Sequence, residues 1–341
     1  MTSAKPSGPG LAWDSSRPGP RRAVVALVLP AALLMPFGLI ATALRIFPPT
    51  DGATALAASF IPYGTLAYAL CLLCFGLALV LARRKRALGV LTVACAALLV
   101  LQLSWLVPLF VPDNRPATTR PFTLLSLNIR GESGNAEDIM TQSANADIVV
   151  LLETTPAAIR ALKAVGMEER FGYTAGLQSH GSASAIYSRF PLTGVQPLPQ
   201  TSFQMWRATA QVPRLGPVQI ITAHPCNPFC GAGYWPSEHA LLQRVISHDL
   251  SGPLVVAGDF NAVDDHRPMR ELYALGLKSV TDIVGAGWLP TYPANAPVPP
   301  LIPIDHILVD DQLTGTSIST VRVSGSDHLG LLATLAGTRP G

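Results

Sequence analysis

Charged residues are scarce in this chain, and its C-terminal part lacks a surplus of basic ones. Charged side chains make up 13% of the 341 residues. Residues 120–341 carry 14 Lys/Arg against 18 Asp/Glu, a net charge of −4, whereas residues 1–119 carry 10 against 3, a net charge of +7. A protein that binds duplex nucleic acid tightly normally presents a basic surface to the phosphates. The composition therefore disfavours tight duplex binding, although a bound cation would change the local field.

Cysteine is also rare, with five in the whole chain. Cys71, Cys74 and Cys95 fall in long apolar stretches, where cysteine serves as a small packing residue. Cys226 and Cys230 are followed by no second Cys/His pair at metal-ligand spacing, which argues against a zinc site. In an oxidising compartment they could form a small loop disulfide, or they could remain two free thiols, and the sequence leaves both open.

Long apolar runs dominate the N-terminal part. They cover about residues 23–45, 56–82 and 87–111. At 1.5 Å per residue, each is long enough to cross the ~30 Å hydrocarbon layer of a bilayer. We therefore predict three transmembrane helices.

The distribution of basic residues predicts their orientation. Arg21 and Arg22 precede the first apolar run, and the basic run 83–86 separates the second from the third. Basic segments stay in the cytoplasm, so three crossings place everything after about residue 112 outside it. The segment Ala41-Thr42-Ala43 resembles a signal-peptidase site, but the first run is long for a signal peptide, and we favour a retained anchor. Cleavage would leave two helices and the same outside location.

The chain divides by composition into four parts. Residues 1–22 are predicted to be a disordered cytoplasmic tail, 23–111 the transmembrane region, 112–121 a linker and 122–341 a catalytic domain. In the last part, apolar β-rich runs alternate with helical patterns, which is typical of an α/β domain. The predicted strands cover 122–128, 147–153, 183–188, 217–224, 253–258, 303–309 and 329–335.

One helix is predicted with a clear apolar face. Residues 236–250 place Leu242 and Ile246 on that face. His239 and His248 fall on the polar side of the same helix, and we expect both in solvent.

Polar motifs follow apolar runs at several predicted strand ends. They are Gly258-Asp259-Phe260-Asn261, Ile304-Asp305-His306 and Ser326-Asp327-His328, with Asn128 and Glu153 at the ends of two earlier runs. If the carboxylates converge, each like-charge pair at 4 Å costs ~4 kcal/mol at an effective dielectric of 20. Such a cluster needs a cation or a proton, and oxygen ligands favour Mg²⁺ or Mn²⁺.

In order and composition, these motifs resemble the endonuclease/exonuclease/phosphatase superfamily over about residues 120–337. The resemblance implies an α/β four-layer sandwich, in which two packed mixed β-sheets are flanked by helices, preceded here by an N-terminal helical transmembrane region. The arrangement is similar to that of membrane-anchored bacterial members. It implies a multi-pass protein of the bacterial plasma (inner) membrane with an extracytoplasmic catalytic domain. Two departures, Gly330 in place of a common proline and Leu152 in place of a common glutamine, weaken the link to the nuclease branch.

The resemblance implies a metal site and assigns three residues to it. Glu153 would be the principal metal carboxylate. Asn128 and Asp327 would lie nearby as direct or water-mediated ligands. The expected cofactor is Mg²⁺ or Mn²⁺.

The resemblance also assigns catalytic roles to five residues. Asp259 would align or deprotonate the attacking water, and Asn261 would help to orient the water and the phosphate. His328 would contact the phosphoryl oxygens, with Asp305 holding its ring in one tautomer. His224 would contact the phosphate or the leaving group.

The expected function is hydrolysis of a phosphodiester or phosphomonoester by a divalent-metal-dependent, membrane-anchored enzyme. The substrate could carry a phospholipid headgroup, be a small phosphodiester, or be a nucleic acid. The acidic domain and the bilayer contact of the N-terminal helices favour the first two. An extracytoplasmic nuclease is the alternative within the fold, and a catalytically silent binding domain of the cell envelope is the alternative outside enzymology. No protein partner can be inferred.

Overall fold

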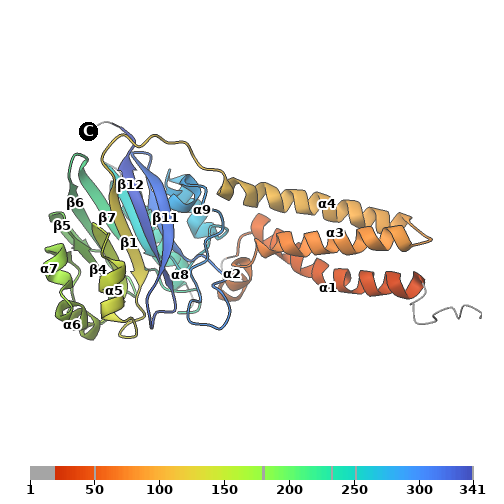
Figure 1. Cartoon of the computed structure of the whole chain (residues 1–341), viewed down its shortest axis with the longest axis horizontal. Coiled ribbons are helices and arrows are strands. Elements are labelled where there is room, and N and C mark those ends of the chain that lie inside the picture. Colours follow the sequence, from red (N-terminus) through yellow and green to blue (C-terminus); the bar gives the residue numbers. More distant parts are fainter. Residues whose placement is uncertain (1–19, 50, 179–180, 232, 250–251, 340–341) are drawn as a thin grey trace, which may run out of the picture. The chain divides into compact units, whose positions relative to one another are not determined.

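The computed structural model describes residues 20–49, 51–178, 181–231, 233–249 and 252–339 (Figure 1). Most of the predicted tail, residues 1–19, lies outside them. The chain forms two compact units. One combines Met1–Ile40 with Tyr63–Gln102, and the other combines Ala41–Pro62 with Leu103–Gly341. The loop between the first two long helices therefore belongs to the same unit as the C-terminal domain.

Within the part of the chain that the structure describes, three helices are long and apolar enough to cross a membrane: α1 (Pro20–Ile46), α3 (Tyr63–Leu81) and α4 (Arg86–Leu106). The short 3-10 helix η1 (Val107–Phe110) follows α4. Few side chains in the apolar stretches of the three long helices are buried within the protein, as expected for helices that face lipid.

The second predicted span began too early. The long helix starts at Tyr63 rather than at residue 56, because residues before it form a separate short helix, α2 (Gly52–Ala58). Asp51 caps α2, since its Oδ1 accepts a hydrogen bond from the Thr54 amide at 3.0 Å. Alanine and leucine in α2 made it look like part of a membrane helix.

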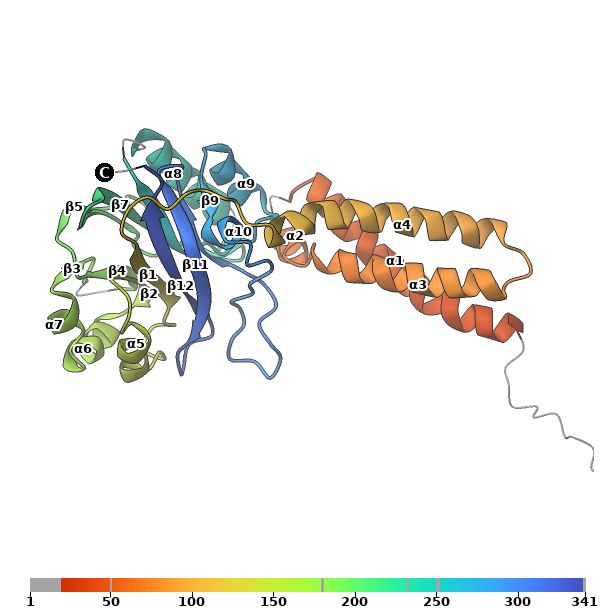
Figure 2. The same ribbon diagram turned by 45° about the horizontal axis from the view of Figure 1, so that its top comes forward.

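Two six-stranded sheets form the C-terminal domain. The first has the order β11-β12-β1-β2-β4-β3 and the second β5-β6-β7-β8-β10-β9. The first sheet contains β1 (Phe122–Asn128), β2 (Ile148–Thr154), β3 (Tyr173–Ala175), β4 (Ala183–Ser188), β11 (Leu313–Arg322) and β12 (Leu329–Gly337). The second contains β5 (Leu192–Pro197), β6 (Trp206–Val212), β7 (Gly216–Ala223), β8 (Leu254–Asp259), β9 (Lys278–Ser279) and β10 (Asp305–Val309). In Figure 2, β11, β12 and β1 run side by side.

The sheets pack face to face. One core cluster unites Leu124 and Val150 of the first sheet with Val255 and Ile307 of the second, all fully buried. Alternate residues on each strand point to opposite faces, so the other faces of these strands need cover as well. The nearly continuous apolar sequence of β2 and β8 reflects burial on both sides.

Helices supply that cover. α5 (Ala136–Gln142), α6 (Pro156–Ala164) and α7 (Met167–Phe171) pack on the outer face of the first sheet, while α8 (Tyr234–Asp249) and α9 (Arg267–Ala274) pack on that of the second (Figure 1). The one-turn helix α10 (Val280–Ile283) follows β9. The predicted four-layer α/β sandwich is confirmed.

The prediction for His239 was wrong. Its side chain is fully buried and its Nε2 lies 3.0 Å from the carbonyl oxygen of Phe260, because the chain that follows β8 covers this side of α8. Burial lowers the pKa of His239 to about 3. His248 is exposed, as expected.

The two cysteines of the domain, Cys226 and Cys230, form a disulfide in the loop between β7 and α8. Of the two readings that the sequence left open, the structure therefore contains the disulfide.

Candidate active site

Strand ends bring the predicted site residues together. β1 and β2 are parallel neighbours, as are β7 and β8, so each pair presents its carboxyl ends at one edge. β10 runs antiparallel to β8 and places Asp305 directly opposite Asp259. These ends, with the turns just beyond or before them, carry Asn128, Glu153, His224, Asp259, Asn261, Asp305, Asp327 and His328.

Asp259 lies buried at the centre of the group. Its Oδ1 accepts a hydrogen bond from the backbone amide of Asn261 at 2.8 Å, and its Oδ2 accepts one from Nδ2 of Asn128 at 3.1 Å. Burial raises the pKa of Asp259, while the nearby charge of His328 opposes that rise. A carboxylate with a raised pKa is a better proton acceptor near neutral pH.

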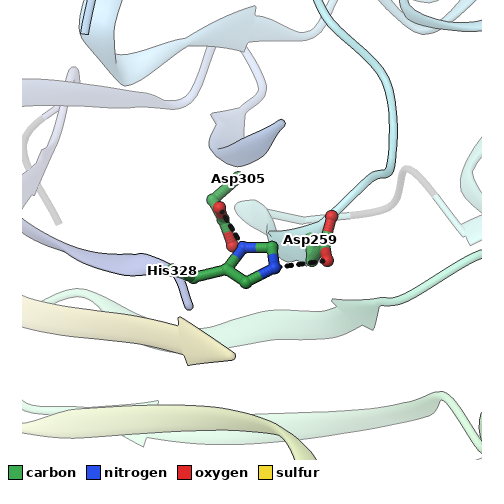
Figure 3. Close-up of side chains that lie close together, drawn as sticks. All are labelled: Asp259, Asp305 and His328. Atoms are coloured by element: carbon green, nitrogen blue, oxygen red, sulfur yellow. Dashed lines mark hydrogen bonds and ion pairs between the residues drawn. The ribbon is translucent and has the colours of Figure 1, made fainter. Parts of the chain in front are cut away.

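Asp305 and His328 form a tight pair (Figure 3). Nδ1 of His328 lies 2.8 Å from Oδ2 of Asp305, and Nε2 lies 3.7 Å from Oδ2 of Asp259. Burial by itself would lower the pKa of His328, but the Asp305 and Asp259 carboxylates outweigh it and raise the pKa to about 10. His328 is therefore a cation at neutral pH, with one ring N–H donated to Asp305 and the other facing Asp259.

His224 lies on another side of Asp259 and is neutral, in contrast to His328. Its Nε2 lies 3.8 Å from both Oε1 of Glu153 and Oδ2 of Asp259, and its ring stacks on Phe203 with centroids 4.2 Å apart. Burial and, to a lesser extent, the charge of His328 together lower the pKa of His224 to about 3. The buried Nδ1 has no hydrogen-bond partner among the described residues, so a proton on Nε2, facing two carboxylates, is the favoured tautomer.

Glu153 has an unusual backbone. Its φ of +58° lies in the left-handed region, where a non-glycine residue is strained, and the pairing of β2 with β4 is irregular between Leu151 and Thr154. The irregularity turns the Glu153 carboxylate toward Asn128, whose Nδ2 donates to its Oε1 at 3.0 Å. Strain of this kind is typically retained at functional sites.

Asn128 thus joins the two halves of the site. Its Nδ2 donates to Glu153 and to Asp259, and its Oδ1 accepts from the amide of Arg130 at 2.9 Å. In this orientation the side chain aligns two carboxylates, and its predicted role as a metal ligand stays a prediction.

Asp327 and Asn261 lie at the rim. The Asp327 side chain is 21% exposed, and its Oδ2 lies 3.5 Å from Nε of Arg130. Nδ2 of Asn261 donates to the carbonyl of Pro225 at 3.0 Å, so its contribution to Asp259 comes through its backbone N–H.

The donor set fits a hard divalent cation. Glu153, Asp259 and Asp327 supply carboxylate oxygens around one pocket, and the neutral His224 adds no positive charge between the first two. Asp259, Asp305 and His328 also form a buried cluster that could in principle hold a metal. The hydrogen bond between Asp305 and His328 occupies both, so we place the candidate cation site on the Glu153 side.

A pocket of about 450 Å³ opens over these groups. Several residues that line it were not predicted from the sequence: Leu56, Ser59, Phe203, Phe229, Tyr292 and Ile302. Two further positioning contacts also carried no recognised signal. Oγ1 of Thr291 accepts a hydrogen bond from the Asp305 amide at 3.3 Å, and Oγ of Ser326 donates to the carbonyl of Asn128 at 2.7 Å. The Ser326 contact could have been suspected from the Ser-Asp-His motif.

The chain is similar to known proteins in sequence pattern and in fold. The family model of the Endonuclease/Exonuclease/phosphatase family matches residues 125–328. None of the curated proteins matches the chain. The fold is similar to that of TDP2 from D. rerio, solved with a single-strand DNA product, which is 16% identical with a TM-score of 0.52 over 64% of this chain and 99% of that one.

Two bacterial structures are also similar. An endonuclease/exonuclease/phosphatase protein from Bacteroides vulgatus is 16% identical, with a TM-score of 0.52 over 64% of this chain and all (100%) of that one. The 3′ phosphatase NExo from Neisseria, bound to a product DNA hairpin, is 18% identical, with a TM-score of 0.50 over 62% and 98%. At these identities the likeness describes the fold.

Proposed function

Since the chain belongs to the endonuclease/exonuclease/phosphatase family, whose members hydrolyse phosphoester bonds, we propose that it is a membrane-anchored, divalent-metal-dependent phosphoesterase. Its substrate is a phosphodiester or phosphomonoester, and water is the nucleophile. The observation that carries the proposal is the buried Asp259 carboxylate, whose Oδ2 lies 3.8 Å from Nε2 of His224 and 3.7 Å from Nε2 of His328.

The residues divide the reaction among them. Asp259 accepts a proton from the attacking water as the water oxygen bonds to phosphorus and the ester P–O bond breaks. The leaving oxygen takes a proton from solvent as it departs. Protonated His328, held by Asp305, donates a hydrogen bond to the phosphoryl oxygens, where negative charge grows in the transition state. His224 contributes a neutral donor from Nε2.

The carboxylates of Glu153 and Asp327, with Asn128 behind them, would hold Mg²⁺ or Mn²⁺. When bound, such an ion neutralises charge on phosphoryl or leaving-group oxygens. The excess of carboxylate over cationic side chains in the pocket supports this requirement, since the repulsion among them is relieved by a cation.

We further propose that the catalytic unit is extracytoplasmic, in a bacterial plasma membrane. Residues 47–62 follow the first membrane-length helix and residues 111–341 follow the third, and both belong to one compact unit, which supports their lying on one side of the membrane. An odd number of crossings after the basic N-terminal segment supports that side being the exterior. Ala41 and Thr42 are buried and helical, which supports retention of the first helix over cleavage there.

The test uses the full chain in detergent with bis-p-nitrophenyl phosphate and p-nitrophenyl phosphate. We expect turnover of at least one compound that EDTA abolishes and Mg²⁺ or Mn²⁺ restores. Asp259→Asn should reduce kcat by about 1,000-fold or more, because the proton acceptor is lost. Asp311→Asn, an exposed aspartate away from the site, is the matched control.

The alternatives give different results. No chelator-sensitive turnover of either compound, nor of DNA, would leave a catalytically silent binding domain. Cleavage of plasmid or single-stranded DNA in preference to the small esters would favour the nuclease.

A further inference from the structure

One wall of the pocket is formed by α2 and the disulfide loop (residues 226–230), and it carries apolar side chains that phosphoester hydrolysis does not require. Leu56 of α2 and Phe229 of the loop both line the pocket, yet they are 47% and 63% exposed. Exposed large apolar side chains beside a polar site mark a surface that binds an apolar partner. We refer to Leu56 and Phe229 with their supporting segments as the apolar lip.

The lip is firmly built into the catalytic unit. Ala55 of α2 is fully buried in the same core cluster as Phe260, and its carbonyl oxygen lies 2.8 Å from Nε2 of the buried His266. A Cβ on Gly52 would lie 2.4 Å from the carbonyl oxygen of Pro228, so the start of α2 packs closely on the disulfide loop. The lip is therefore a fixed wall of the site.

Its position along the chain ties it to the membrane. Five residues, 47–51, connect α2 to the membrane-length α1, and four, 59–62, connect it to the membrane-length α3. At ~3.3–3.6 Å per residue, neither connection can extend beyond roughly 18 Å. The last residues of α1, from Ala41, belong to the catalytic unit itself, where Nε of Arg45 lies 2.9 Å from Oδ1 of Asp265. The apolar lip is thus held close to the bilayer surface.

The charged residues that line the pocket favour an amphiphilic substrate over a nucleic acid. Among the described residues that line it, none is lysine or arginine. A nucleic-acid strand presents a row of phosphates and is normally held by several cationic side chains. A lipid presents one phosphate group beside an apolar chain, and it needs only one polar centre flanked by an apolar surface.

Resting on the proposed hydrolytic function, we propose that the substrates are lipid phosphoesters: the phosphate enters the site of Asp259 and His328, and the first part of the hydrocarbon chain lies on Leu56 and Phe229. The lip then determines specificity, and the bilayer supplies the substrate.

The test compares two diesters with the same leaving group, dodecyl p-nitrophenyl phosphate and methyl p-nitrophenyl phosphate, on the full chain in phosphatidylcholine nanodiscs. The measured quantity is the ratio of their kcat/KM values. We expect the wild type to prefer the dodecyl ester, and Leu56→Gln or Phe229→Ser to lower the ratio about tenfold, which is the contribution of burying one such side chain against a hydrocarbon. Val195→Gln, which replaces an exposed valine of β5 that does not line the pocket, should keep the wild-type ratio.

A second measurement needs no turnover. Dodecyl methyl phosphate with a diazirine at the chain end should label residues 55–60 or 226–231 on irradiation, in the wild type and in Asp259→Asn, and unlabelled compound should compete. Absence of turnover with correct labelling would refute the hydrolytic function and leave the lip as a lipid-binding site.

Three results would overturn the proposal: an unchanged ratio in both lip variants, labelling elsewhere in the chain, or a higher kcat/KM on a DNA oligonucleotide that Leu56→Gln leaves untouched.

Discussion

His328 donates a hydrogen bond from Nδ1 to Oδ2 of Asp305 at 2.8 Å, and this pairing decides both the direction and the charge of its ring. Asp305 sits at the first residue of β10, opposite Asp259 on β8. One strand pairing therefore fixes the spacing between the proposed proton acceptor and the cation beside it. Replacing either residue of the pair tests the arrangement.

Asp305→Asn should lower kcat by about 100-fold, because the amide keeps a polar contact but removes a buried negative charge. The sign of the pH effect follows from the raised pKa of His328, about 10 in the wild type. Protonated His328 persists below that value, so the alkaline fall in the wild-type rate comes as pH rises through it. Without the Asp305 charge the alkaline limb should move to lower pH, as seen in kcat/KM profiles. An unmoved limb in Asp305→Asn would contradict the role of His328 as the cation.

Glu153→Gln should raise the Mg²⁺ or Mn²⁺ concentration for half-maximal activity by about 10–100-fold, since it removes the most accessible carboxylate of the proposed metal site. The measurement is a metal titration of activity after treatment with EDTA. Glu132→Gln, in the loop that follows β1, is the control. If Glu153→Gln and the wild type need the same metal concentration, Glu153 is not a ligand of the ion that supports activity.

His239 should make the domain sensitive to acid. It is neutral in the folded state, with a pKa lowered to about 3, whereas the unfolded chain takes up a proton near pH 6.5. The contribution of neutral His239 to the free energy of unfolding is therefore fully present above pH 6.5. It is lost as pH falls toward 3, and the loss reaches about 3 kcal/mol at pH 4. His239→Gln, which can still donate to the Phe260 carbonyl, should flatten the fall of Tm between pH 6.5 and 4. His248→Gln, on the exposed side of the same helix, should give the wild-type curve, and parallel curves for all three proteins would contradict the argument.

Topology can be read with alkaline-phosphatase fusions, which are active only outside the cytoplasm. Fusion after Gly341 should be active and fusion after Arg84, in the basic turn between α3 and α4, inactive. The opposite pattern would place the catalytic unit in the cytoplasm.

The sequence predicted the buried strands well and the edge strands poorly. β2 and β8 have nearly continuous apolar sequence because both of their faces are covered. β5 lies at a sheet edge and is largely exposed, while β11 alternates serine and threonine, so neither carries an apolar run. Without burial there is no periodic signal to recognise.

The candidate site also combines residues that the sequence pattern reveals with residues that it does not. Motifs named the carboxylates and histidines that the structure brings together around Asp259, because such residues at strand ends are conspicuous in the sequence, whereas the contacts of Thr291 and Ser326 were missed. The wall formed by Leu56 and Phe229 was not predicted, because Leu56 lies in an apolar run that predicts a span and Phe229 is a single apolar residue in a loop. Asp51, which caps α2, precedes that run and is a typical helix-start residue, but the hydropathy of the residues after it favoured one continuous span.

The hydrogen bond between His266 and Ala55 links residues 211 positions apart. In the proposed topology, Ala55 is synthesised and exported long before His266, so its carbonyl lacks this partner while α3 and α4 enter the bilayer. The catalytic unit can then complete its core only after His266 has crossed the membrane. A C-terminal domain cut away from α2 would lose Ala55 from that core, so we expect proteolytic release to destabilise the domain.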